Sequence, residues 1–70
     1  MTVTAEQVLR TNIKKFRNAK KLTQEELSEM AGISRDYLSE IERGLRFPSM
    51  KRLDMIAVAL GLDTYKLLKP

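Results

Sequence analysis

The side chains of this chain that could do chemistry are charged and hydrogen-bonding groups rather than catalytic bases. Its 70 residues include no histidine and no cysteine, which removes the commonest general base and metal ligand and every thiolate zinc site. The sequence has no glycine-rich phosphate loop either. A formal net charge of +4 and a pI near 9.7 favour an anionic partner. These observations argue against an enzyme and predict neither a metal nor a cofactor.

The densest set of such groups lies between Ser34 and Gly44. Leu38 and Ile41 are three residues apart, so on a helix they share one face, which would be buried. The positions that this face does not use are Arg35, Asp36, Tyr37, Ser39 and Glu40. The basic residues around the next connection are Arg43, Arg46, Lys51 and Arg52. The spacing therefore predicts a helix with one buried face and one hydrogen-bonding face.

Local signals predict the helices that would position these groups. Thr23 and Glu26 have the spacing of a capping box, which predicts a helix over residues 24–31 that ends at Gly32. Ser34 is a favourable N-cap for a second helix over residues 35–43. Two short helices joined by a glycine turn form a helix-turn-helix, here over residues 23–43. This arrangement sets its second helix into a DNA major groove.

The same reasoning predicts three further helices and a single all-α domain over residues 1–70. They span residues 5–20, 50–60 and 64–68, with Thr4, Ser49 and Asp63 as their N-caps, and residues 1–4 are a loose end. No segment shows the alternation of a strand. The longest apolar run, residues 55–60, is too short to span a bilayer, and the first residues lack the features of a signal peptide. We therefore expect a cytoplasmic protein with no membrane partner.

The motifs LTQEEL, GISR and IERG, the last followed by Pro48 and Ser49, resemble those of a Cro/cI-type helix-turn-helix domain. That family includes phage repressors, controller proteins and bacterial regulators, and the resemblance covers residues 9–68. It implies a compact five-helix, lambda-repressor-like DNA-binding domain. It further implies a sequence-specific transcriptional regulator, such as a repressor, whose helix 35–43 reads an operator. Ser28 stands where the family usually has alanine, and serine is small enough to keep the close helix crossing.

The resemblance implies two sets of contacts with double-stranded DNA. Base edges would be read by Arg35, Asp36, Ser39 and Glu40, and the backbone would be held by Thr23, Gln24, Tyr37, Arg43, Arg46 and Lys51. Arg35 could donate two parallel hydrogen bonds to guanine. Three positions keep a second interpretation. Asp36 could stabilise its helix N-terminus, Tyr37 could simply cover helix 24–31, and Glu40 could pair with Arg43.

Two other sets of residues carry structural expectations. Arg17 and Glu42 match positions that pair in some relatives, which would orient helix 35–43, although two unrelated surface charges are the alternative. One recognition helix contacts few base pairs, so we expect a homodimer. Its interface would lie in the apolar C-terminal segment, at Tyr65, Leu67 and Leu68. The alternative there is a final helix that only closes the core.

A second function remains open on the same fold. An antitoxin-type or other protein-binding module would share the predicted helices and would often bind DNA as well. No small-molecule substrate is expected for either function.

Overall fold

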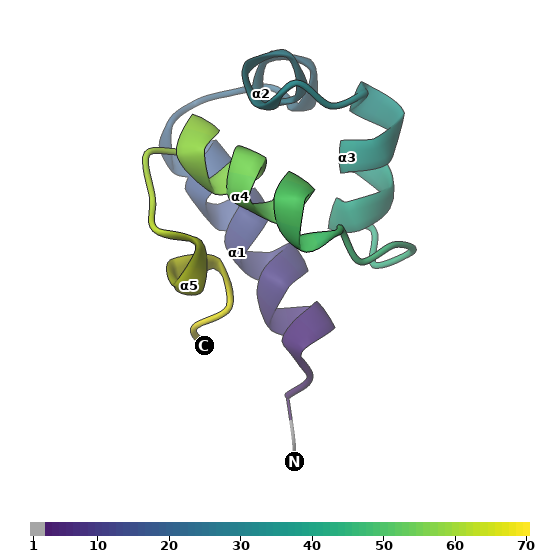
Figure 1. Ribbon diagram of the computed structural model, residues 1–70, viewed down its shortest axis with the longest axis vertical. Helices are drawn as coiled ribbons and strands as arrows, with labels where there is room; N and C mark the ends of the chain where they lie inside the picture. The colour runs from purple at the N-terminus through teal and green to yellow at the C-terminus, as the bar shows by residue number, and fades with distance from the viewer. Residues whose placement is uncertain (1–2) are drawn as a thin grey trace.

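Five helices make up the part of the chain that the structure, a computed structural model, describes, which is residues 3–70. In chain order they are α1 (Ala5–Ala19), α2 (Gln24–Ala31), α3 (Arg35–Glu42), α4 (Met50–Ala59) and α5 (Thr64–Leu67). Helices α2 and α3 lie at one end of the molecule, α4 crosses in front of α1, and α5 lies beside them (Figure 1). The predicted all-α, five-helix fold is confirmed for these residues. Residues 1 and 2 of the predicted loose end lie outside the described residues.

The helices begin where hydroxyl side chains accept the first free backbone N–H groups. Thr4 and Thr23 form complete capping boxes with Gln7 and Glu26, as predicted. The Ser34 and Ser49 hydroxyls accept the N–H groups of the third helical residues that follow them. Asp63 occupies the N-cap position of α5 but makes no capping hydrogen bond with its side chain. Asp63 is therefore the N-cap residue, as predicted, but its side chain does not cap the helix.

Helices α1, α3, α4 and α5 each end one residue before the predicted end. The residues concerned, Lys20, Arg43, Leu60 and Leu68, have ψ between −3° and 1°, which departs from helical geometry and makes them C-caps. Helix α2 ends as predicted, because Gly32 adopts a φ of 72° that a residue with a side chain rarely takes. These small shifts leave every predicted helix in place.

The core fills the space between all five helices. Its buried members are Leu9, Ile13, Leu27, Ala31, Leu38, Ile41, Leu53, Ile56, Ala57, Leu60 and Leu67. Leu67 is 0% exposed, so the prediction that it lies at a dimer interface is wrong. Leu67 occupies the face of α5 that packs inward, whereas Tyr65 is 61% exposed and Leu68 is half-buried. Large apolar side chains are also exposed outside the C-terminal segment, at Met30, Leu45, Phe47, Met50 and Val58.

Asn12 ties the end of the chain to α1, a contact that helical periodicity does not reveal. Its side chain is buried, and its Nδ2 donates to the carbonyl oxygens of Lys66, Leu67 and Lys69 at 3.3, 2.9 and 2.8 Å. Two of these carbonyls belong to the last residues of α5, where no further helical N–H is available to them, and the third follows the helix. A four-residue helix is too short to be stable alone. Asn12 and the burial of Leu67 therefore hold α5 in place.

Replacing Asn12 by Ala is expected to lower the free energy of unfolding by about 1–3 kcal/mol, because buried carbonyls lose their donor. Urea unfolding would measure the loss, with the exposed neighbour Thr11→Ala as the matched control. Equal and small losses in the two variants would contradict this role for Asn12.

Candidate nucleic-acid interface

The turn between α2 and α3 fixes the angle between these two helices. The Ile33 N–H donates to the Ser28 carbonyl at 3.0 Å, across the left-handed Gly32. Ser28 is buried, and its hydroxyl donates to the carbonyl of Glu25 at 2.8 Å. Its polar atom is therefore satisfied within its own helix, and the small side chain lets the two helices pack closely. The predicted helix-turn-helix is present.

The outward face of α3 carries the predicted base-reading residues. Leu38 and Ile41 are buried against the core, as the spacing predicts. On the other side of the helix Arg35 and Asp36 are exposed, and Ser39 and Glu40 are half-buried. The structure thus places the predicted base-reading residues together on one surface of α3, which is exposed at its start and half-buried further along.

The N-terminus of α2 lies beside the start of this surface. Thr23, Gln24 and Arg35 line an open hollow of about 580 Å³, together with Arg17 and Glu25. The Thr23 hydroxyl accepts the Glu26 N–H, which leaves its own proton free to donate. The first backbone N–H groups of a helix attract an anion. Two predicted backbone contacts and the predicted guanine reader therefore meet at one site.

A buried ion pair joins α3 to α1. Arg17 Nε and Nη2 donate to Glu42 Oε2 and Oε1 at 2.8 and 2.9 Å. Arg17 Nη1 donates to the Leu22 carbonyl at 2.8 Å, and Gln24 Nε2 donates to Glu42 Oε1 at 3.1 Å. The side chain of Glu42 is only 2% exposed. Gln24 thus donates one amide proton to Glu42, which leaves its second amide proton available as a donor.

Two arginine side chains lie over the ring of Tyr37, which is in the first turn of α3. The guanidinium carbons of Arg46 and Arg52 lie 5.1 and 5.2 Å from the centre of its ring, within the range of cation–π attraction. The ring is half-buried against the core. Glu40 accepts from Arg46 Nε at 2.8 Å, so its partner is Arg46 and not the predicted alternative, Arg43. No helical spacing rule relates residues 40 and 46, so the sequence could not reveal this pair.

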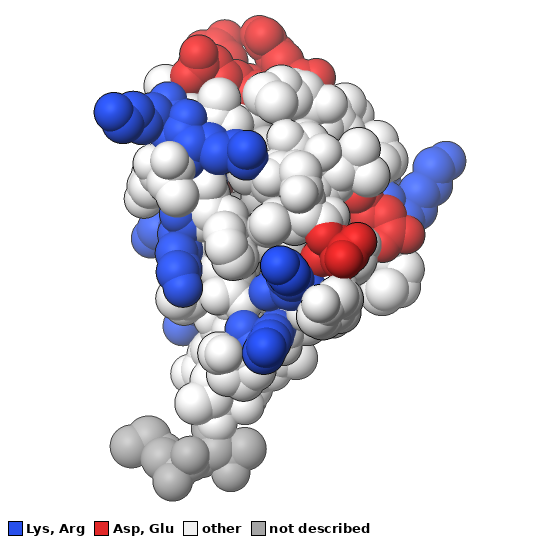
Figure 2. Space-filling view, turned by 90° about the vertical axis from the view of Figure 1, so that its left-hand side faces the viewer, with Lys and Arg blue, Asp and Glu red and all other residues white. Residues whose placement is uncertain are grey.

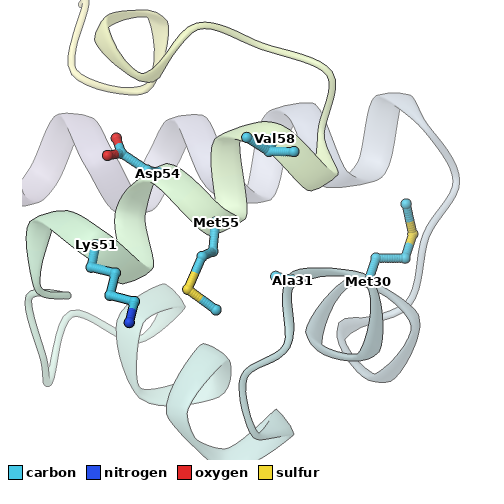
Figure 3. Close-up of a pocket in the computed structure, with 6 residues that line it drawn as sticks. All are labelled: Met30, Ala31, Lys51, Asp54, Met55 and Val58. Carbon is cyan, nitrogen blue, oxygen red and sulfur yellow. The ribbon is translucent and has the colours of Figure 1, made fainter.

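The remaining predicted backbone contacts are less closely grouped. Arg43 is exposed at the C-cap of α3. Lys51 lies on α4 and lines a groove of about 360 Å³ with Met30, Ala31, Asp54, Met55 and Val58, as Figure 3 shows. The guanidinium of Arg52, the next residue, instead lies over the Tyr37 ring. The sequence had grouped these two basic residues together, and the structure separates them because neighbouring helix positions point about 100° apart.

Acidic side chains lie on α2 as well as at Asp36 and Glu40 on α3. Figure 2 views the side of the molecule opposite α3 and shows acidic groups at the α2 end. Glu25, Glu26 and Glu29 are exposed on α2. Among residues 3–70 no group of three His, Cys, Asp or Glu side chains could hold a metal ion. No helix in the same range is long and apolar enough to cross a membrane.

Two short helices packed across a glycine turn, with a polar outer face on the second, define a helix-turn-helix protein. A profile of the helix-turn-helix family matches residues 13–67, and the chain belongs to this family. It is 48% identical over 51 residues to an immunity repressor protein of Bacillus phage phi105, covering 73% of this chain and 35% of the repressor. The chain thus spans about a third of that relative's length.

Solved structures agree with this assignment. The hypothetical transcription factor NHTF from Neisseria superimposes with a TM-score of 0.92 at 36% identity, over 96% of this chain and 77% of that one. SinR, a master regulator for biofilm formation solved in complex with DNA, gives a TM-score of 0.83 at 35% identity, over 87% and 98% of the two chains.

Reversing the charge of Arg17, to Glu, is expected to lower the free energy of unfolding by about 3–5 kcal/mol, because the buried Glu42 then lacks a partner. Adding Glu42→Arg to this variant should recover part of the loss. Thermal and urea unfolding would measure both. Arg46→Glu breaks the exposed pair with Glu40 and serves as the control, with an expected change of about 1 kcal/mol or less. Additive losses without recovery would argue against the buried pair.

Proposed function

We propose that α3 enters the major groove of an operator, and that the chain acts as a sequence-specific DNA-binding transcriptional regulator of the helix-turn-helix family. The observation that carries the proposal is the position of Arg35. It stands at the start of the outward face of α3 and lines the same hollow as the N-terminus of α2. A helix N-terminus that holds a phosphate would fix the register of Arg35 on the bases. The related DNA-bound SinR structure supports this use of the fold.

The proposed roles follow from charge and exposure. Arg35, Asp36, Ser39 and Glu40 face the base edges, with Arg35 donating to guanine O6 and N7. Thr23 and Gln24 hold one phosphate. Tyr37, Arg43, Arg46 and Lys51 lie along the backbone on the far side of α3, where contacts give affinity without sequence information. The proposed place of action is the bacterial cytoplasm, where such a chain has access to duplex DNA.

Selection of bound sequences from a random duplex pool would test the function, with enrichment of an inverted repeat as the expected result. The Arg35→Ala variant should lose about 1–3 kcal/mol on that repeat and accept any base at one position of each half-site. Its affinity for unrelated duplex should barely change. An equal loss on both kinds of DNA would make Arg35 a phosphate contact, and failure to enrich any sequence would contradict the proposed function.

We also propose that the chain binds as a symmetric homodimer through a surface of α4 and α5. Its apolar members are Val58, which is 77% exposed, Tyr65, which is 61% exposed, and the half-buried Leu68. The Thr64 hydroxyl donates to Asp54 at 2.6 Å, which fixes the start of α5 against α4 one turn from Val58. Asp54 and Val58 project from the same side of α4 in Figure 3. A two-fold contact needs one self-complementary patch of this kind.

The double variant Val58→Glu, Tyr65→Glu is expected to sediment as a monomer at micromolar concentration, whereas the unmodified chain sediments as a dimer. Burying two new carboxylates against their symmetry mates would be unfavourable. Leu45→Glu places the same change on an exposed apolar side chain of the α3–α4 connection and should leave the dimer intact. A wild type that remains monomeric both free and on DNA would contradict the proposal.

A further inference from the structure

Glu40 is an acidic residue on a surface proposed to meet a polyanion. Its Oε1 accepts from Arg46 Nε at 2.8 Å, and the two side chains are 39% and 50% exposed. Arg46 is one of the basic residues proposed to lie along the DNA backbone. The carboxylate therefore occupies a donor that a phosphate could use.

The pair is not needed to place Arg46. The guanidinium already stacks 5.1 Å from the centre of the Tyr37 ring, and that ring is itself packed against the core. Exposed ion pairs are weak because water solvates both partners, so the carboxylate can be exchanged for another anion. Carboxylate and phosphate oxygens bind a guanidinium with the same geometry.

We propose that Glu40 is an intramolecular substitute for phosphate, which holds Arg46 in the free protein and lowers its affinity for duplex DNA of any sequence. Arg46 then contacts the backbone only by exchanging the Glu40 carboxylate for a phosphate oxygen, while Tyr37 keeps the guanidinium in position. The inference rests on the proposed function, because it needs α3 to face DNA.

The test measures the affinity of four variants for a random-sequence duplex across a range of salt concentrations. Glu40→Gln should bind about two- to five-fold more tightly than wild type, the factor expected for release of an exposed ion pair. For this variant, the slope of log affinity against log salt concentration should become steeper by up to about 0.9, because Arg46 is then fully available to a phosphate. Glu29→Gln removes the same charge from an exposed site on α2 and should change affinity less.

The decisive comparison uses Arg46→Gln with and without Glu40→Gln. If Glu40 acts through Arg46, the gain from Glu40→Gln shrinks to that of Glu29→Gln once Arg46 is absent. Unchanged melting temperatures would show that the variants keep their fold, and the Arg46 Nε–H resonance of the free protein should shift in Glu40→Gln. An equal gain with and without Arg46, or no gain at all, would overturn the inference. Absence of any duplex binding by the wild type would instead overturn the DNA-binding function, and this inference with it.

Discussion

The orientation of α3, the helix proposed to read DNA, depends on one buried carboxylate. Glu42 is the last residue of α3, and each of its oxygens accepts a hydrogen bond from Arg17, with Gln24 donating to one of them as well. A charge at 2% exposure is tolerated only when it is fully paired. The pairing is directional, so it ties the end of α3 to α1 and to the first turn of α2 at defined angles. Apolar contacts alone would hold these helices together without fixing those angles.

Short helices make such ties necessary. Helices α2 and α3 have eight residues each, a length that is unstable in isolation. Side-chain caps begin both helices, and Leu27, Leu38 and Ile41 bury their inner faces. Their outer faces contribute little to stability and can therefore carry polar groups, including those proposed to contact DNA. At the opposite end of the molecule, Asn12 plays a comparable part for α5 by donating to carbonyls that the helix itself cannot satisfy.

The proposed interface combines attraction for phosphate with groups that limit it. Arg46 and Arg52 share the Tyr37 ring, which orders two flexible cations before any ligand arrives. Glu40 pairs with one of these cations, while three exposed acids, Glu25, Glu26 and Glu29, lie on α2. A surface with only basic groups would bind every duplex strongly. In the proposed arrangement, the Glu40 carboxylate reduces that general affinity without removing Arg46.

The sequence by itself determined the helices, because caps, glycine turns and apolar spacing are local signals. It also indicated the outward face of α3, since Leu38 and Ile41 assign the opposite face to the core, and it paired Arg17 with Glu42 through a family resemblance. It could not place Leu67, because a four-residue helix is too short for periodicity to show which side packs inward. The Asn12 contacts, the Glu40–Arg46 pair and the stack on Tyr37 were decided by the tertiary structure alone. Each joins residues that come within hydrogen-bonding or stacking distance only when separate segments pack together. The strength of such contacts falls steeply with distance, so spacing along the chain cannot predict them.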